Sequence, residues 1–96
     1  MTSDRKRVVK IGGYTIDLDK AEKIAAEYRR RLEKARELRR EKADWDYIES
    51  REEPLKTALK LFVETGDLWF SAKLTGVLID VLNEERRKAK IPIVVV

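Results

Sequence analysis

Hydrophobic and polar positions alternate at the start of this chain, and the alternation is interrupted by two glycines. The runs Arg7-Val8-Val9-Lys10-Ile11 and Tyr14-Thr15-Ile16-Asp17-Leu18 flank Gly12-Gly13. Runs rich in β-branched residues on both sides of a glycine pair are typical of a tight turn, so we expect a β-hairpin over residues 7–18. A glycine-rich hairpin can also wrap a phosphate, but a single Gly-Gly pair is weak evidence for that.

From residue 20 the apolar positions recur every three or four residues. The recurring positions are Ala21, Ile24, Tyr28, Leu32, Ala35 and Leu38. They share one helical face, which predicts a long basic amphipathic helix over residues 20–49, with Asp19 as its N-cap. A narrow apolar stripe on a long charged helix favours packing against a partner helix, for example from a second copy of the chain.

A second helical pattern begins after residue 50. Its apolar positions are Leu55, Ala58, Leu59, Phe62 and Val63, the spacing of a buried helix face. Ser50 and Glu53 have the spacing of a capping box, so we expect Ser50 to cap this helix, with Pro54 in its first turn.

Two further glycines divide the rest of the chain into short helices. Gly66 is expected to end the preceding helix as a left-handed cap, and Asp67 to begin the next one. Ala72 lies where two helices approach closely, and Gly76 marks a sharp turn into a third helix. The third helix is expected from about Leu78 to Ala89, with Leu78, Val81 and Leu82 facing inward. Helix, sharp turn and helix together predict a helix-turn-helix over residues 51–90.

The last six residues are apolar and β-branched, apart from Pro92, which is expected to stop the third helix. An exposed strand of this kind promotes aggregation, so we expect a strand over residues 91–96 that pairs with residues 8–11 or with a second subunit. The sequence therefore predicts a mostly α single domain: an N-terminal β-hairpin, a long amphipathic helix, and a three-helix helix-turn-helix unit with a C-terminal β-strand.

Composition excludes several classes of function. The 96 residues contain no cysteine and no histidine, which removes thiolate chemistry, the usual general base and the commonest transition-metal ligand. The carboxylates of residues 44–53 lack the spacing of a calcium loop and are explained by helix starts and caps. We therefore expect no catalytic activity, no metal and no cofactor. No apolar run approaches the roughly 20 residues of a membrane span, and no signal peptide is visible, so we expect a cytoplasmic protein without a membrane partner.

Charge is the next informative property. Charged residues make up 42% of the chain and its formal net charge is +4. This composition, with almost no amide side chains, is typical of thermophile proteins. Basic residues are concentrated in the long helix and at the end of the third helix. The candidate nucleic-acid-binding residues are Arg29, Arg36 and Arg40 in the long helix, and Arg86, Arg87, Lys88 and Lys90 near the C-terminus. The alternative is a solvated helix face with interleaved ion pairs.

Trp69 and Phe70 are adjacent on a short helix, so both cannot face the same core. One of them can stack on a base or insert into a partner. The alternative is that one belongs to the core and the other covers a neighbouring helix. We take Trp69 and Phe70 as candidate partner-binding residues, together with Val94 and Val95 of the apolar end.

The C-terminal half also resembles a known family. The resemblance rests on Ala58-Leu59-Lys60-Leu61-Phe62, Gly66, Ser71-Ala72-Lys73-Leu74-Thr75-Gly76 and Ile91-Pro92-Ile93, within roughly residues 53–96. These runs are similar to those of small prokaryotic helix-turn-helix proteins, common in archaea and largely uncharacterised, some of which are thought to be antitoxins. The segment between Gly66 and Ala72 is about two residues shorter than the family pattern. The resemblance implies a dimeric DNA-binding transcriptional regulator or an antitoxin.

Two hypotheses of function follow. In the first, the chain is such a regulator, and double-stranded DNA is its partner. However, the third helix carries Asp80, Glu84 and Glu85, and carboxylates repel phosphate. In the second, the chain is a non-catalytic accessory subunit of an archaeal nucleic-acid machine, such as a replicative DNA polymerase or a ribosome. The helix-turn-helix is then a protein-interaction scaffold, and the chain is a homodimer or a subunit of a hetero-complex.

Overall fold

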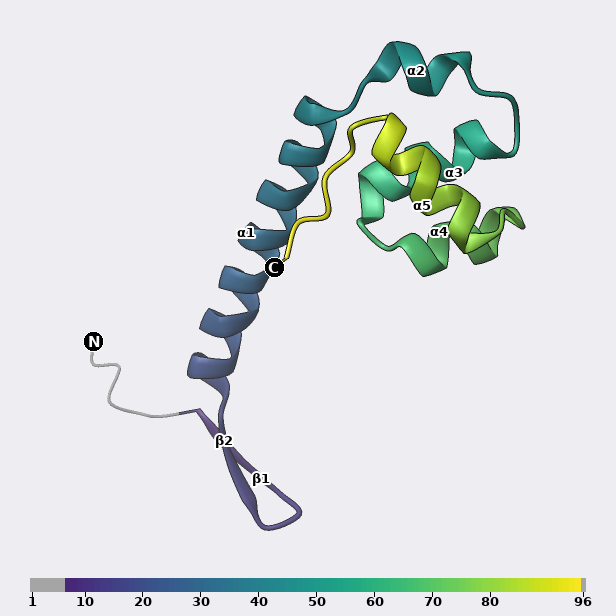
Figure 1. Cartoon of the computed structure of the whole chain (residues 1–96). Helices are drawn as coiled ribbons and strands as arrows, with labels where there is room; N and C mark the ends of the chain where they lie inside the picture. Colours follow the sequence, from purple (N-terminus) through teal and green to yellow (C-terminus); the bar gives the residue numbers. More distant parts are fainter. Residues whose placement is uncertain (1–6, 96) are drawn as a thin grey trace. The chain divides into compact units, whose positions relative to one another are not determined.

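The computed structural model describes residues 7–95, which form two short strands followed by five helices (Figure 1). The elements are β1 (Val8–Ile11), β2 (Tyr14–Asp17), α1 (Leu18–Lys42), α2 (Trp45–Ser50), α3 (Leu55–Thr65), α4 (Leu68–Thr75) and α5 (Ile79–Lys88). The predicted class is confirmed: a hairpin, a long helix and several short helices. The chain divides into two compact units, one ending at Leu32 and one beginning at Glu33. α1 runs through the boundary between them.

The N-terminal unit contains the hairpin and the first half of α1. β1 and β2 pair antiparallel, with Val9 opposite Ile16 and Ile11 opposite Tyr14. Since side chains alternate across a strand, these four apolar residues share one face of the hairpin. The N-cap of α1 is Asp17 rather than the predicted Asp19. The Asp17 carboxylate accepts hydrogen bonds from the backbone N–H groups of the second and third residues after it, because α1 begins two residues earlier than expected.

α1 ends at Lys42, so the prediction of one continuous helix over residues 20–49 is wrong. The chain breaks at Asp44, whose carboxylate accepts a hydrogen bond from the backbone N–H of Tyr47 at 3.1 Å. The backbone N–H of Asp44 donates to the carbonyl of Ala89 at 2.7 Å. An N-cap and a long-range hydrogen bond at one residue separate α2 from α1.

The predicted capping box is also wrong. Ser50 is the last residue of α2, where its hydroxyl donates to the carbonyl of Tyr47. α3 begins only after Pro54, and the Glu53 carboxylate accepts a hydrogen bond from the backbone N–H of Thr57 at 2.8 Å. Glu53 therefore caps the first turn of α3 without Ser50, which belongs to the end of α2.

The apolar core lies in the C-terminal unit. Its buried members are Ala43, Ile48, Ala58, Leu59, Phe62, Val63, Ala72, Leu82, Ala89 and Ile91. α3 supplies four of them, as its spacing predicts. Leu82 of α5 is fully buried, but Leu78 and Val81 are exposed, so their predicted inward orientation is wrong. Leu78 precedes the helix as its N-cap, and Val81 is turned about 100° from Leu82 around the helix axis.

α5 ends in a left-handed turn before it reaches Pro92. The backbone N–H of Ile91 donates to the carbonyl of Arg86, and that of Lys90 donates to the carbonyl of Arg87, both at 3.1 Å. This pattern is a Schellman motif, with Lys90 at φ 58° in the position that glycine usually occupies. The turn directs Ile91 into the core, where it is almost completely buried.

Residues 91–95 form no strand, so the predicted C-terminal strand is wrong for that range, and residue 96 lies outside the described residues. The carbonyl of Ile91 accepts a hydrogen bond from Nη1 of Arg86 at 2.9 Å. Pro92 has no N–H to donate to a ladder. Within residues 7–95 the sheet contains β1 and β2 alone.

Gly66 packs closely against the buried Arg39 side chain, whereas Gly76 has open space around it. Substituting the two glycines therefore tests how much this close packing contributes to stability. Both have left-handed backbones, at φ 69° and 76°. A β-carbon at Gly66 would lie 2.6 Å from Nη1 of Arg39, whereas one at Gly76 would meet nothing within 4 Å. Arg39 is buried and its Nε donates to the carbonyl of Val63 at 2.8 Å, so it cannot move without loss.

We therefore predict that Gly76→Ala costs about 1–2 kcal/mol of unfolding free energy from backbone strain. Gly66→Ala should cost about 1–2 kcal/mol more, because it also displaces a buried charged hydrogen bond. Urea unfolding of the two variants measures the difference. Equal losses would contradict the packing of Arg39 against Gly66.

Candidate functional site

Hydrogen bonds to Asp67 fix the first turn of α4, and a left-handed glycine ends its last turn. The Asp67 carboxylate accepts a hydrogen bond from the backbone N–H of Phe70 at 2.8 Å, and the Ser71 hydroxyl donates to the Asp67 carbonyl at 2.7 Å. Ser71 and Ala72 are buried, where small side chains let α4 approach α3 and α5 closely. Gly76 ends the helix in the left-handed conformation, as predicted.

The opposite side of α4 carries large apolar side chains. Trp69 is 60% exposed, and Phe70 and Leu74 are also exposed. Nζ of Lys73 lies 4.6 Å from the centroid of the Trp69 ring, a cation–π contact that holds the ring on the surface. The alternative in which one of the two aromatic residues belongs to the core is wrong.

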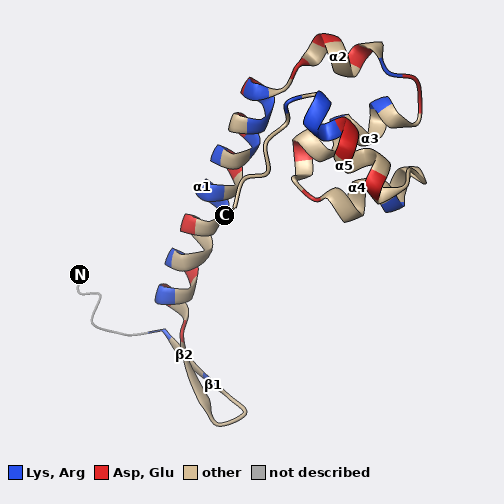
Figure 2. Ribbon diagram, viewed as in Figure 1, with Lys and Arg blue, Asp and Glu red and all other residues tan. Residues whose placement is uncertain are grey.

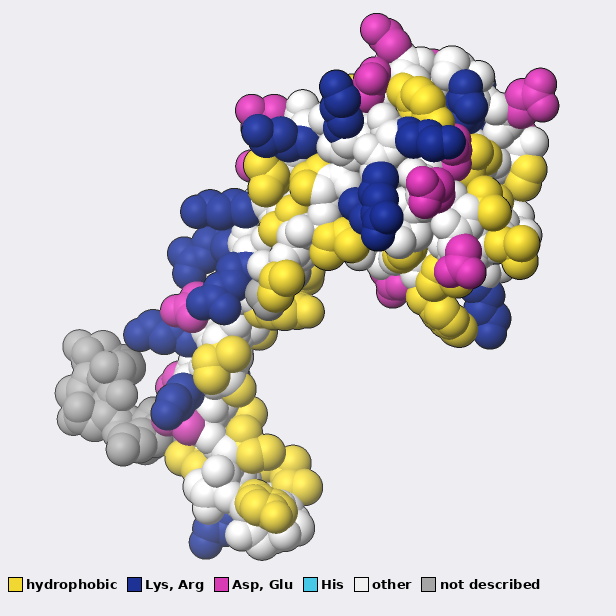
Figure 3. Space-filling view, viewed as in Figure 1, with side chains coloured by type: hydrophobic (Ala, Val, Ile, Leu, Met, Phe, Trp, Pro, Cys, Tyr) yellow, Lys and Arg dark blue, Asp and Glu magenta, His cyan; other side chains and the backbone are white. Residues whose placement is uncertain are grey.

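Exposed apolar residues continue through the turn into α5. We call this surface the α4–α5 face; its apolar members are Trp69, Phe70, Leu74, Leu78, Ile79 and Val81. Figure 3 shows apolar side chains over α4 and the turn that follows it, with acidic side chains beside them. Asp80 and Glu84, both exposed on α5, supply carboxylates to this surface.

Glu85, the residue after Glu84, is buried rather than exposed. The hydroxyl of Tyr47 donates to its Oε1 at 2.7 Å, Nζ of Lys88 lies 3.3 Å from its Oε2, and Nη1 of Arg51 lies 3.8 Å from its Oε1. Burial alone would raise the pKa of Glu85, but the hydrogen bonds from Tyr47 and Lys88 and the charges of Lys88 and Arg51 together lower it. The ionised carboxylate therefore joins α2 to α5.

The predicted phosphate contacts at the C-terminus have different surroundings. Arg86 is 9% exposed, and its guanidinium donates to Asn83 and to the carbonyl of Ile91. Lys88 pairs with Glu85. Arg87 and Lys90 are exposed. The structure thus leaves two of the four cations open to a ligand and gives Arg86 a structural role.

The three predicted phosphate-binding arginines of α1, Arg29, Arg36 and Arg40, also differ in exposure and in hydrogen-bond partners. Arg29 is exposed. Nε of Arg36 is buried and finds no hydrogen-bond partner among residues 7–95. Arg40 pairs with Glu64 of α3 through two nitrogen atoms, with Nη2 and Oε2 only 2.7 Å apart. Figure 2 shows acidic residues interleaved with the basic ones along α1. The interleaving supports the alternative of a solvated helix face, and the ion pair of Arg40 runs to Glu64 of α3.

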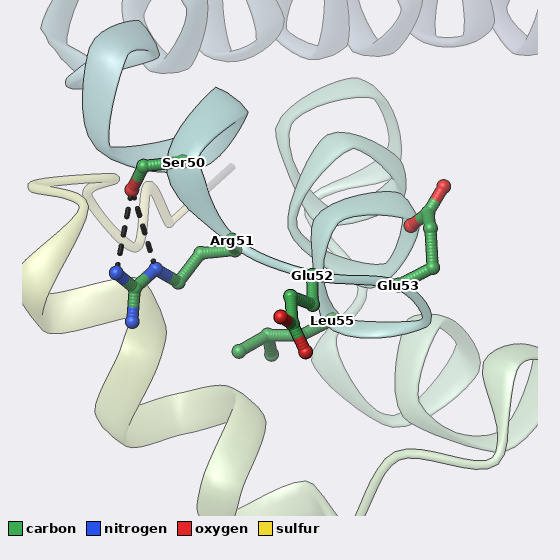
Figure 4. Close-up of a pocket in the computed structure, with 5 residues that line it drawn as sticks. All are labelled: Ser50, Arg51, Glu52, Glu53 and Leu55. Atoms are coloured by element: carbon green, nitrogen blue, oxygen red, sulfur yellow. Dashed lines mark hydrogen bonds between the residues drawn. The ribbon is translucent and has the colours of Figure 1, made fainter.

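An open hollow of about 420 Å³ lies beside the loop between α2 and α3, lined by Ser50, Arg51, Glu52, Glu53 and Leu55 (Figure 4). Arg51 turns towards Ser50, with Nε and Nη2 each 3.4 Å from the hydroxyl oxygen, and its guanidinium lies over the Tyr47 ring. Glu53 points away from Arg51. The charged groups do not converge, so the hollow has no arrangement for one ligand.

The remaining predictions concern the apolar C-terminal residues, metal binding and membrane-spanning helices. Val95 is 92% exposed, whereas Val94 is half-buried. Across residues 7–95 no cluster of carboxylates could hold a metal ion. None of the helices described above is long and apolar enough to cross a membrane.

Comparison of the chain with protein-family models, with curated proteins and with solved structures found no match. The resemblance to small prokaryotic helix-turn-helix proteins stays a prediction.

The sequence pattern located two of the six apolar residues of the α4–α5 face, Trp69 and Phe70. Trp69 and Phe70 were recognised because two adjacent aromatic residues cannot share one core. Leu78 and Val81 were assigned to the core, although the separation of about 100° between Val81 and Leu82 is a signal against that assignment for Val81. Leu78 shares the face of Leu82 by spacing, and it is exposed because it precedes the helix as its N-cap. The role of Glu85 was missed, since a carboxylate at a core position is identifiable only when its partners on another helix are known.

Glu85 makes a prediction about pH. Its lowered pKa means that its contribution to stability is present above the unfolded-state pKa and is lost as pH falls through the folded-state pKa. Between about pH 5 and pH 3 the unfolding free energy should fall less in Glu85→Gln than in the wild type. At pH 7 the variant should be about 1 kcal/mol less stable.

Urea titrations across this pH range measure the effect. Glu84→Gln, a change at the neighbouring exposed carboxylate, is the matched control and should follow the wild type. If Glu85→Gln and Glu84→Gln give the same acid dependence, the Tyr47–Glu85–Lys88 contacts contribute nothing specific.

Proposed function

We propose that this chain is a non-catalytic interaction module whose α4–α5 face binds another protein. The observation that carries the proposal is an exposed apolar surface on a unit that already has its own core. Monomeric proteins rarely expose large contiguous apolar patches, and such patches commonly mark binding sites for other proteins. Trp69 is suited to anchor the partner, because exposed tryptophans that become buried often dominate binding energy.

The position of this face argues against DNA as its ligand. A helix-turn-helix contacts bases through the start of its second helix and phosphates through helix N-termini. The start of α5 carries Leu78, Ile79 and Asp80. None of these side chains is a positively charged hydrogen-bond donor. Apolar and acidic groups lower the affinity for a phosphate backbone. They suit a protein surface with apolar side chains and nearby lysine or arginine residues.

This proposal corresponds to the accessory-subunit hypothesis. The helix-turn-helix serves as a scaffold that holds the apolar residues outward while Ser71, Ala72 and Leu82 pack inward. An antitoxin that holds a toxin through this face would be a special case of the same activity.

We predict that affinity capture from the native lysate returns one stoichiometric partner with the wild-type chain, and that Leu78→Asp loses it. Trp69→Ala should weaken the purified complex by about thirtyfold or more, the loss of a typical tryptophan hot spot. Fluorescence of Trp69, in a Trp45→Phe background, should shift to shorter wavelength on binding because the ring leaves water.

Ile93→Asp is the matched control, since it places the same charge at an apolar residue that is 61% exposed outside the α4–α5 face. It should retain the partner. Loss of the partner in Ile93→Asp with retention in Leu78→Asp would assign binding to the C-terminal segment instead. Recovery of the chain alone in every case would overturn the proposal.

Duplex DNA is a second candidate ligand, supported by the exposed cations Arg29, Arg87 and Lys90. Because phosphate contacts release counterions, DNA binding through these residues must weaken steeply between about 50 and 200 mM salt. Fluorescence anisotropy with a labelled duplex at both concentrations tests this candidate. Arg87→Ala should reduce the salt dependence if it holds, and absence of binding at the lower salt would eliminate it.

A further inference from the structure

Three arginines lie close together where the second half of α1 meets the end of α3. Arg39 donates to the carbonyl of Val63, and Arg40 donates to the carboxylate of Glu64, the next residue of α3. Arg36 lies three residues before Arg39 and four before Arg40, so the helix makes it a neighbour of both. All of these residues belong to the C-terminal unit. The three arginines differ in how well their charges are balanced.

Arg39 is a buried cation without a carboxylate partner. It is 5% exposed, and it forms no ion pair within residues 7–95. The hydrogen bond that its side chain makes there runs from Nε to the carbonyl of Val63, which carries no charge. A guanidinium also has N–H donors on both Nη atoms, and buried charges in proteins are normally paired. Nη1 and Nη2 of Arg39 are therefore free to bind an anion.

Arg36 also lacks an acceptor. Its Nε is buried and finds no hydrogen-bond partner in the described part of the chain. A buried donor of this kind is rare in folded proteins, because leaving it unpaired costs free energy. Burial is the main cause that lowers the pKa of Arg39, and the charge of Arg36 lowers it further, while Glu64 raises it. The two neighbouring guanidinium groups thus lack acceptors and repel each other.

The carboxylate nearest to these two groups is already engaged. Both oxygens of Glu64 accept hydrogen bonds from Arg40, at 2.7 and 2.8 Å. The hydrogen bonds and charge of Glu64, and more weakly the charge of Glu37, raise the pKa of Arg40. Arg40 therefore has its own counter-ions. The end of α3 offers Arg36 and Arg39 only the negative end of its helix dipole, about half an elementary charge.

The guanidinium of Arg39 ends at an exposed turn. A β-carbon at Gly66 would lie 2.6 Å from Nη1 and 3.1 Å from Nη2 of Arg39, so this glycine lies directly against the guanidinium. Gly66 itself is exposed, and Arg36 is only partly buried. A small ligand can therefore approach the two arginines from solvent, beside the turn between α3 and α4.

Charge and geometry select a phosphate group as this ligand. Guanidinium groups bind carboxylates and phosphates through pairs of parallel N–H donors. A carboxylate or a phosphate diester carries a single negative charge. A phosphate monoester carries about −1.5 to −2 at pH 7 and has three acceptor oxygens. That charge matches two guanidinium groups of which the helix dipole balances only a part.

We propose that Arg36 and Arg39 form a binding site for a phosphate group, either free phosphate or a small phosphate monoester. Arg39 keeps its hydrogen bond to Val63, which fixes its guanidinium, and donates to the phosphate through Nη1 and Nη2. Arg36 turns its guanidinium towards the same phosphate, which supplies an acceptor for its unpaired donor. The site shares no residue with the α4–α5 face and does not rest on the function proposed for that face.

Calorimetric titration of the chain with inorganic phosphate, at constant ionic strength in chloride, tests the site. The wild type should bind one phosphate, and its midpoint of thermal unfolding should rise as phosphate replaces chloride, because a ligand of the folded state stabilises it. Arg36→Gln should weaken binding about tenfold or more, the loss of a charge-assisted hydrogen bond. This variant should fold, since Arg36 is only partly buried and its Nε is unpaired.

Arg30→Gln is the matched control, because it removes the same charge from an exposed position of the same helix. It should bind phosphate as the wild type does. A wild type that neither binds phosphate nor gains stability over chloride overturns the proposal, and so does an equal loss of binding in the two variants. The wild-type titration decides the matter even if Arg36→Gln unfolds.

Two further ligands define what the site recognises. Binding of glycerol 3-phosphate with an affinity similar to that of inorganic phosphate would show that the site accepts a monoester. Binding of inorganic phosphate alone would restrict the site to the free ion. Acetate should bind far more weakly than either, because it carries one charge. Acetate binding as tight as that of phosphate would overturn the assignment of the site to phosphate.

Discussion

The apolar core is confined to the C-terminal unit, and this constraint shapes the rest of the molecule. Buried apolar side chains lie between Ala35 and Ile91, and α3 supplies the centre with Leu59, Phe62 and Val63. α4 approaches this core through small side chains, so its large ones must face outward. The hairpin and the first half of α1 contribute no buried side chain to it. The two apolar surfaces of the chain are therefore what remains after one small core has been completed.

Several charges of this basic chain are structural. Arg39 donates to a carbonyl of α3, Arg86 donates to the carbonyl of Ile91 beyond the end of α5, and Glu85 joins α5 to Tyr47 of α2. Buried charges are tolerated where hydrogen bonds replace water, and removal of one partner leaves the other unpaired at considerable cost. A net charge of +4 consequently overstates the cations available to nucleic acid. The α4–α5 face, by contrast, combines apolar area with carboxylates.

The α4–α5 face belongs to the unit that contains the buried core. The α4–α5 face is carried on a packed scaffold, which keeps Trp69 and Leu78 exposed at little conformational cost to binding.

Local patterns in the sequence determined the hairpin at Gly12-Gly13, the buried face of α3, the cap at Asp67 and the left-handed turns at Gly66 and Gly76. These features depend on residues only a few positions apart, through backbone sterics and helical periodicity. Tertiary contacts decided the absence of a strand after Ile91 and the burial of Glu85 and Arg86, and they secured the break of the long helix at Asp44, where a local N-cap is also present. Each depends on a hydrogen bond or contact that the fold supplies: Asp44 N–H to Ala89, Arg86 to Ile91 and Tyr47 to Glu85. Leu78 and Val81 were misplaced for the same reason, because helical spacing marks an apolar residue without showing whether the core has room for it.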